Sequence, residues 1–329
     1  MNTHWSGARE RGTVPLLRIM RWIALTLGWR AGWVLLYPIT AWFLAASPGA
    51  RRSSRDFLAR ALGRPAGAWD VARHFFTFAS VILDRVFLLT GRTARFRIET
   101  DGLEHVVRLA EARRGCILMG AHLGSFEALR SLARQSPVSV RPMMYRRNAG
   151  ALTRLLEQLD PEMRERVIEI GGPEGVLRAR DSLARGEIVA LLADRAPAGQ
   201  AMVPTTFLGG TAGFPAGPFL LAAGLAAPVV LFHGLRTGPR RYVLRFEPFA
   251  DPLVLPREGR AAALRDCVGR FAASLEAQCR AHPLNWFNFY PFWEGPGDVG
   301  THASGAAVAG GRGVRLQAAA RGTSGTAGA

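Results

Sequence analysis

Short apolar runs alternate with helical patterns from residue 97 onward. The runs cover residues 115–121, 138–145, 166–170, 187–193 and 228–235. Such alternation predicts an α/β fold, with a mostly parallel sheet covered by helices. In open sheets of this kind, ligand sites form at the carboxyl ends of strands. Polar residues that directly follow an apolar run are therefore the first candidates for chemistry.

The flanking segments complete this predicted domain. Residues 241–249 alternate apolar and polar positions, which predicts an antiparallel strand at the sheet edge. Residues 259–281 have the spacing of a long amphipathic helix, and residues 51–92 also predict helices. Arginines between residues 51 and 60 either face solvent or meet lipid phosphates.

The N-terminal region has a membrane-seeking pattern. Residues 15–30 mix arginines with large apolar residues, as interfacial helices do, and residues 31–50 contain no charge. An uncharged segment of that length just spans a bilayer, although Pro38 lies within it. We therefore predict a membrane anchor or re-entrant helix in residues 1–50. A buried core helix and a cleaved signal peptide are the alternatives.

The C-terminal region has a different composition. Residues 295–329 are mostly Gly, Ala, Ser and Thr, which predicts a disordered tail after an α/β domain at 51–294. The tail begins with a literal G-x-G-x-x-G at residues 295–300. That motif follows an aromatic block instead of a strand and contains proline, so it does not indicate a dinucleotide site.

Composition narrows the possible functions. The chain has 42 basic and 25 acidic residues, for a formal charge of +17, and every basic residue is arginine. Anionic lipid, acidic substrates and nucleic acid all fit such a charge. The arginines are spread along the chain and most aromatics lie in apolar runs, which disfavours nucleic acid. Without lysine, a Schiff base, a lysine general base and a phosphate-binding P-loop are excluded.

The cysteines do not suggest a metal site. Cys116 lies in an apolar run, and Cys267 and Cys279 lie in the predicted long helix. Their spacing fits neither a metal site nor a disulfide framework. We therefore expect no metal site and a reducing compartment.

The sequence GAHLGSFE places a histidine directly after the first apolar run. Neutral imidazole can take a proton from an alcohol, and a nearby carboxylate fixes its tautomer. Glu127 follows His122 by five positions and is the predicted partner. Such a pair would support acyl transfer to a hydroxyl without a covalent nucleophile. The alternative is a structural histidine followed by an ordinary first-turn acid.

Other polar or small residues cluster around the same strand ends. The sequence YRRN, which starts at Tyr145, ends the second run, and Asp194 follows the fourth run. Residues 203–218 are rich in small residues that let a backbone approach a ligand. Residues 219–227 would line an acyl-chain groove or form a buried helix. The predicted substrate-binding residues are Ser125, Arg146, Arg147, Asn148, Asp194, Arg195, Phe207 and Gly209.

Two further motifs bear on the class of enzyme. No G-x-S-x-G elbow occurs, so a serine hydrolase with Ser125 as nucleophile is disfavoured. Residues 285–293 hold six aromatics, which we interpret as core and pocket wall.

The order of these features resembles the bacterial lipid A biosynthesis acyltransferase family, the late acyltransferases of the lysophospholipid acyltransferase superfamily. The likeness covers residues 15–294 and includes GAHLGSFE, MMYRRN, LLADR, VPTTFLGG and WFNFYPFW. The resemblance implies an inner-membrane enzyme whose catalytic domain faces the cytoplasm. Its activity would move a fatty acyl group from an acyl carrier protein or coenzyme A thioester to a glycolipid hydroxyl, with no other cofactor.

The resemblance also assigns residues. It makes His122 the general base and Glu127 its partner, and it matches Arg146 and Asp194 to polar positions of the family. Arg146 or Arg195 would bind phosphate or stabilise the oxyanion. Phe126 and Arg195 depart from the lipid A enzymes, and the HLGSFEALR and WFNFYPFW segments look more like members that assemble aryl polyene or other glycolipids. A catalytically inactive, basic, membrane-binding relative is the alternative.

Overall fold

The structure is a computed structural model that describes residues 22–129, 139–145, 165–197 and 199–293. The predicted residues Arg146, Arg147 and Asn148 lie outside these ranges, as does the C-terminal tail.

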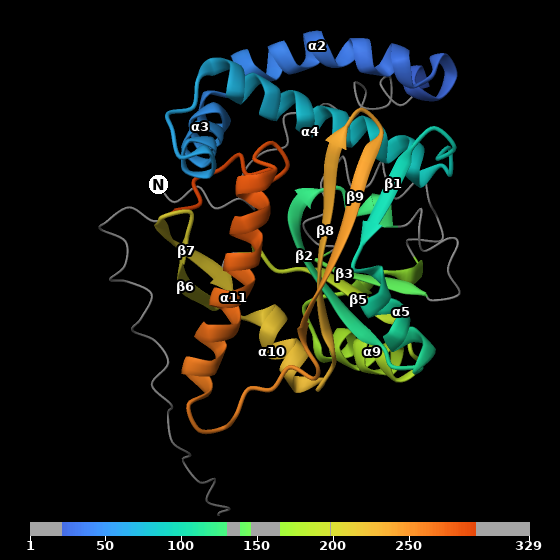
Figure 1. Cartoon of the computed structure of the whole chain (residues 1–329), viewed down its shortest axis with the longest axis vertical. Coiled ribbons are helices and arrows are strands. Elements are labelled where there is room, and N and C mark those ends of the chain that lie inside the picture. Colours follow the sequence, from blue (N-terminus) through green and yellow to red (C-terminus); the bar gives the residue numbers. More distant parts are fainter. Residues whose placement is uncertain (1–21, 130–138, 146–164, 198, 294–329) are drawn as a thin grey trace, which may run out of the picture. The chain divides into compact units, whose positions relative to one another are not determined.

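A seven-stranded sheet in the order β1-β9-β8-β2-β5-β3-β4 forms the centre of the described chain (Figure 1). Its strands are β1 (Arg97–Asp101), β2 (Cys116–Gly124), β3 (Val140–Met144), β4 (Ile168–Glu169), β5 (Ile188–Leu192), β8 (Val229–Gly238) and β9 (Arg241–Ala250). Every neighbouring pair is parallel except β8 and β9. The predicted mostly parallel α/β sheet is confirmed.

The predicted edge position of β9 is wrong. β9 is antiparallel to β8 as expected, but β1 pairs with its other side in parallel. The sequence of β1 is RIETD, and most of its residues are exposed. A strand of this kind has no apolar run, so the hydrophobic pattern could not reveal it.

Seven helices with assigned labels lie around the sheet in the described chain, and several of them match helices predicted from the sequence pattern. They are α2 (Trp29–Ala46), α3 (Pro48–Leu62), α4 (Ala68–Leu89), α5 (Leu103–Glu111), α9 (Pro173–Ala184), α10 (Gly217–Gly224) and α11 (Arg260–Ala281). The expected long helix at 259–281 corresponds to α11, and the helices expected in 51–92 correspond to α3 and α4.

Alternate residues of β2 enter two separate cores. Ile117 and Met119 pack with side chains of α3, α4, α10 and α11. Cys116 and Leu118 pack with Val106 of α5 and with β8 and β9. Strands buried on both faces read as continuous apolar runs, which is why β2 and β5 were evident in the sequence.

The small-residue segment that was expected to approach a ligand is a β-hairpin. Its strands β6 (Met202–Phe207) and β7 (Gly210–Pro215) form a separate two-stranded sheet, and Ala212 of β7 also forms an isolated bridge with Trp293. The following α10 buries Phe219 and Ala222 in the core beside α11. Of the two alternatives for residues 219–227, the structure therefore has the buried helix.

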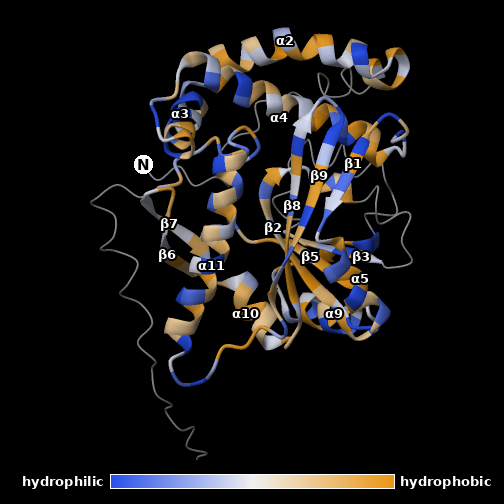
Figure 2. Ribbon diagram, in the orientation of Figure 1, coloured by the Kyte–Doolittle hydropathy of each residue, from blue (hydrophilic) through white to orange (hydrophobic). Residues whose placement is uncertain are grey.

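The predicted anchor forms α2, which packs along α4 (Figure 1). Leu36 on its inner face is fully buried, whereas Val34 and Trp42 on its outer face and Tyr37 at the edge of that face are 50–61% exposed. The Tyr37 ring also contacts Phe76 of α4, with 4.9 Å between the ring centroids. Hydrophobic residues occupy much of this helix in Figure 2. Within the described residues, no single helix is long and apolar enough to cross a bilayer. Only α2 and α3 together reach that length, and they are bent by 99°.

Candidate active site

β2 carries a bulge at the position of His122. Gly120 pairs with Phe232 of β8, whereas Gly124 pairs with Gly234, so four steps along β2 match two along β8. Bulges of this kind bend a strand and re-aim its side chains. Gly124 has a φ of 66°, and a Cβ there would lie 1.9 Å from the Gly234 carbonyl oxygen. The bulge therefore requires glycine at this position.

The His122 ring is held by Asp194, at the end of β5. Gly120 of β2 pairs with Leu192 of β5, so two residues further along each strand bring His122 opposite Asp194. Nδ1 of His122 lies 2.8 Å from Oδ1 of Asp194. The His122 side chain is 39% exposed, whereas the Asp194 side chain is fully buried. A substrate can therefore reach the imidazole but not the carboxylate behind it.

Asp194 is a buried carboxylate with several hydrogen-bond donors. Nε1 of Trp286 donates to Oδ2 at 3.2 Å, and the Arg195 guanidinium donates to the same oxygen at 3.2 and 3.3 Å. Burial acts to raise the pKa of Asp194. The charges of His122 and Arg195, with hydrogen bonds from His122, outweigh burial and keep this pKa well below its ordinary value. Asp194 is therefore ionised at neutral pH.

The same surroundings fix the protonation of His122. Loss of solvent lowers its pKa, the Arg195 charge lowers it further, and Asp194 opposes both effects. The ring is therefore neutral at pH 7. Because an ionised carboxylate only accepts, Nδ1 carries the proton and Nε2 carries the free lone pair. No residue that the structure describes forms a hydrogen bond with Nε2.

Glu127 does not hold the ring, contrary to the prediction. Its Oε2 accepts hydrogen bonds from Nε of Arg85, at 2.7 Å, and from Oγ of Ser125, at 3.1 Å. Glu127 begins a helical turn after β2, and this turn brings its carboxylate to α4 instead of to the strand ends. The Arg85 charge still lowers the pKa of His122, so the Arg85–Glu127 pair borders the same site.

Arg195 binds protein groups on several sides. Besides contacting Asp194, its guanidinium donates to the Phe287 carbonyl at 3.3 Å and lies 5.3 Å from the Tyr290 ring centroid. These contacts tie the carboxylate to the C-terminal aromatic segment. In this structure Arg195 orients Asp194.

The other described residues predicted to bind substrate occupy structural positions. Ser125 is buried, and its hydroxyl donates to Glu127. Phe207 has no exposed surface and packs against Trp286. Gly209 forms the β6–β7 turn with a φ of 73°. None of these side chains offers a free group to a substrate.

No sequence motif indicated that Trp286 is part of the site. Its backbone forms a bridge with Leu123, and the next residue, Phe287, donates its N–H to the His122 carbonyl at 3.1 Å. The aromatic segment thus lies beside the end of β2 and delivers the Trp286 indole to Asp194. A buried tryptophan needs a hydrogen-bond acceptor for its N–H. A tryptophan within a predicted buried aromatic block therefore indicates that a polar group lies beside it.

His74 of α4 supports Trp286 from behind. Its Nε2 donates to the Trp286 carbonyl at 3.0 Å, and Oγ of Ser54 donates to Nδ1 at 2.8 Å. Complete burial lowers the pKa of His74 to about 4. The ring is therefore neutral and acts as a fixed hydrogen-bonding group between α3, α4 and the aromatic segment.

The cysteines are poor candidates for covalent chemistry. Burial raises the pKa of Cys116 to about 12 and also raises the pKa values of Cys267 and Cys279. Their thiols are protonated at neutral pH and are weak nucleophiles in that form. Among the described residues, no group of three His, Cys, Asp or Glu could hold a metal ion.

One family matches most of the chain. It is described as bacterial lipid A biosynthesis acyltransferase, and the match runs over residues 40–294. The matched range contains the β2 bulge, His122, Asp194 and the aromatic segment. No curated protein matches the chain significantly.

Proposed function

The chain belongs to the bacterial lipid A biosynthesis acyltransferase family, and from this premise we propose that His122 and Asp194 transfer a fatty acyl group from a thioester to a glycolipid hydroxyl. Family membership makes the chain an acyltransferase of lipid biosynthesis, with an acyl donor and a lipid acceptor. The 2.8 Å contact between Nδ1 of His122 and Asp194 carries the proposal, because it leaves Nε2 as an accessible base.

In the proposed reaction, Nε2 of His122 takes the proton of the acceptor hydroxyl as its oxygen attacks the thioester carbonyl. Asp194 stabilises the imidazolium that forms and holds the ring by Nδ1. The tetrahedral intermediate then expels the thiolate, which takes the proton from Nε2. The products are an ester and a free thiol, and the histidine is neutral again.

Arg85, held by Glu127, places a guanidinium at the border of the same site. Glu127 holds Arg85 by one 2.7 Å contact, and the Arg85 charge acts on His122. A guanidinium in this position would stabilise negative charge as it develops on the thioester oxygen. We propose that Glu127 positions Arg85 instead of orienting His122. Arg195 is less favourable for this task, because its guanidinium contacts Asp194 through two nitrogens and also contacts the Phe287 carbonyl and the Tyr290 ring. Among the described residues, Arg85 contacts one acid through Nε.

We also propose the chemical class of the acyl donor and of the acceptor. The donor is a thioester of acyl carrier protein or coenzyme A, and the reaction requires no other cofactor. The acceptor is a glycolipid or a lipid A-like molecule, and the resemblance of the HLGSFEALR and WFNFYPFW segments favours a glycolipid other than lipid A. Mass spectrometry of lipids from a deletion strain tests this directly. An unchanged glycolipid profile together with under-acylated lipid A would refute the aryl polyene or other glycolipid assignment.

We also propose that α2 associates with the inner membrane and leaves the catalytic domain on the cytoplasmic side. Its outer face exposes Val34, Tyr37 and Trp42, and α2 contains one charged residue, Arg30. Exposed aromatic and aliphatic side chains on one helical face favour insertion into the bilayer interface.

The central test uses the full chain, a radiolabelled acyl thioester and a lipid extract as acceptor. His122→Gln should abolish the transfer of label to lipid, whereas His105→Gln, on α5, should leave transfer unchanged. Circular dichroism checks that both variants are folded. Full transfer by His122→Gln would overturn the mechanism. Absence of turnover in the wild type with every glycolipid fraction would favour the inactive, membrane-binding relative.

A further inference from the structure

A second site lies on the opposite side of α4 from the candidate active site. Arg85 contacts Glu127 at the active site, whereas Phe87, two residues later, lines a separate cavity of about 290 Å³. Two residues along an α-helix turn the side chain by about 200°. The cavity is therefore distinct from the His122 site.

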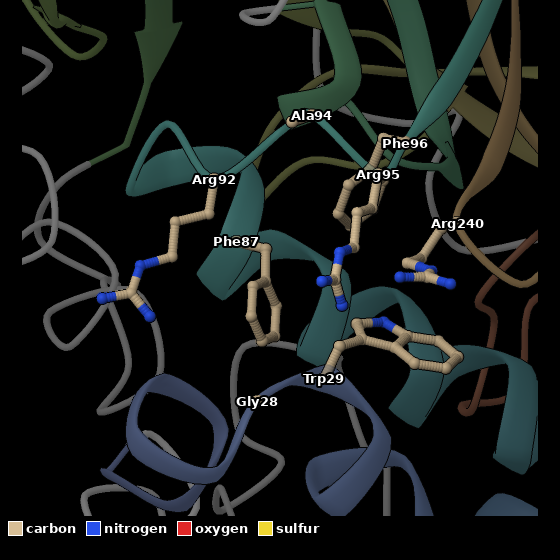
Figure 3. Close-up of a pocket in the computed structure, with 8 residues that line it drawn as sticks. All are labelled: Gly28, Trp29, Phe87, Arg92, Ala94, Arg95, Phe96 and Arg240. Carbon is tan, nitrogen blue, oxygen red and sulfur yellow. The ribbon is translucent and has the colours of Figure 1, made fainter.

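Aromatic rings and arginines line this cavity (Figure 3). The rings belong to Trp29, Phe87 and Phe96, and the cations belong to Arg92, Arg95 and Arg240. In Figure 3 the guanidinium groups of Arg95 and Arg240 lie on the same side, above the Trp29 indole. The Arg240 guanidinium carbon is 4.7 Å from the centroid of the Trp29 ring.

No carboxylate neutralises these arginines within the described chain. Arg92 donates to the Leu25 carbonyl at 2.7 Å, and Arg240 contacts Trp29 through its ring. None of the cavity's arginines takes part in a salt bridge between described residues. Arg92 and Arg95 are exposed and Arg240 is half-buried, so an anion from solvent or from a membrane surface can reach these cations. Like charges that line one cavity repel each other unless an anion lies between them.

The backbone holds one of these cations in place. Arg240 lies in the tight turn between β8 and β9 with a φ of 55°, a left-handed conformation that normally favours glycine. Non-glycine residues in that region store strain, and such residues concentrate at ligand sites. The turn directs the Arg240 guanidinium onto Trp29.

We propose that this cavity binds the phosphate of an anionic membrane lipid. Guanidinium groups bind phosphate oxygens with charge-assisted hydrogen bonds. Gly28 also lines the cavity, and its neighbour Leu27 is 65% exposed. Trp29 begins α2, whose outer face is apolar. A ligand here meets cations and an apolar surface together, which matches an anionic headgroup with its acyl chains. The inference rests on the proposed membrane association of α2 and not on the chemistry at His122.

The test compares binding of the full chain to phosphatidylcholine vesicles and to vesicles that also contain phosphatidylglycerol. The cavity variant is Arg95→Gln with Arg240→Gly, because glycine suits the left-handed turn and keeps the hairpin folded. The control is Arg257→Gln with Arg265→Gln, two exposed arginines near α11. Both variants change the formal charge from +17 to +15.

We expect the wild type and the control to bind anionic vesicles about tenfold or more tightly than neutral ones. The cavity variant should lose most of this preference while it keeps its affinity for neutral vesicles. Equal losses in the two variants would overturn the site, since they would show a diffuse charge effect. A wild type without anionic preference would also overturn it.

A second arm separates lipid from a soluble phosphate compound. Inorganic phosphate is titrated against the wild type and the cavity variant, and thermal unfolding is followed. A rise in the wild-type midpoint, absent in the variant, combined with equal vesicle binding by both, would overturn the lipid assignment. Acyl transfer is not a readout in either arm, so failure of the proposed chemistry at His122 leaves this test intact.

Discussion

At the scale of single residues, the carboxylate that contacts Nδ1 of His122 determines which ring nitrogen can act as the base. Asp194 is fully buried, ionised and fixed by Trp286 and Arg195, so it fixes one tautomer of the ring. Glu127 contacts Arg85 and Ser125 instead. The two carboxylates therefore have separable tasks, and variants of each should fail in different ways.

Asp194→Asn should lower kcat/KM by about 10³-fold or more, as for a catalytic histidine with the wrong tautomer. The amide can donate to Nδ1 and so place the ring proton on Nε2. Glu127→Gln keeps the Asp194 contact and should cost less, because it weakens the contacts with Arg85 and Ser125 but leaves the ring of His122 held. Steady-state kinetics on both folded variants measures the difference. A larger loss for Glu127→Gln would contradict the assignment of Asp194 as the partner.

The pH profile should report the lowered pKa of His122. Partial loss of solvent and the Arg195 charge both lower this pKa below its ordinary value of 6.5. The base must be neutral to act, so kcat/KM should rise with pH through a point below 6.5 and stay level at neutral pH. Arg195→Gln removes a positive charge and should move the rising limb to higher pH. A limb that moves to lower pH would contradict this arrangement.

The sequence predicted His122 and the strand that carries it, because an apolar run ended at a polar residue. It did not predict the Asp194 contact, since parallel register between β2 and β5 is set by two runs far apart in the chain. Trp286 and His74 were missed for a similar reason. Their partners come from other elements, and no local spacing encodes them.

At the scale of elements, the β2 bulge positions the histidine. A Cβ on Gly124 would meet the Gly234 carbonyl, and a Cβ on Gly234 would meet the Ser125 carbonyl, so neither glycine tolerates a side chain without movement of the backbone. These close approaches join β2 to β8 directly after His122. The sheet was predictable from the apolar runs, whereas the bulge was not, because it adds two residues without changing the hydrophobic pattern.

Gly124→Ala should therefore damage both stability and activity. Its Cβ would clash with the Gly234 carbonyl, and its φ of 66° is unfavourable for alanine. We expect a loss of about 2 kcal/mol or more in the free energy of unfolding. Gly63→Ala is the matched control, since its φ is 65° and nothing lies within 4 Å of the added Cβ. Urea unfolding of both variants measures the difference. Equal costs would show that only the backbone angle matters.

Because His74 links α3, α4 and the aromatic segment by hydrogen bonds, the stability of their packing should decrease at acidic pH. Its pKa falls from 6.5 to about 4 in the folded chain, so the unfolded state binds more protons between these values. The contribution of neutral His74 to the free energy of unfolding is fully present above pH 6.5. It falls as the pH approaches 4, by about 3 kcal/mol in total. His74→Gln should remove this part of the pH dependence. An identical pH slope in the variant, measured by urea unfolding, would refute it.

At the scale of the whole molecule, two sides of α4, near its C-terminal end, face two different sites. Its Arg85 side faces the site of chemistry, and its Phe87 side faces α2 and the arginine cavity. α2 covers α4 with its inner face and exposes an apolar outer face. Membrane contact through that outer face would place the cavity at the bilayer surface.

Replacing Val34, Tyr37 and Trp42 by serine should weaken binding to neutral phosphatidylcholine vesicles about tenfold or more, because each lost apolar side chain removes buried area. The matched control replaces Val107, Val176 and Leu177, which are 42–49% exposed on α5 and α9. Flotation of the full chain with vesicles measures both. Since none of the six side chains is charged, the preference for anionic over neutral vesicles should survive in the α2 variant, even as its overall affinity falls. Equal weakening by the control would refute α2 as the membrane-binding face, because the apolar contact would then not depend on where the residues lie.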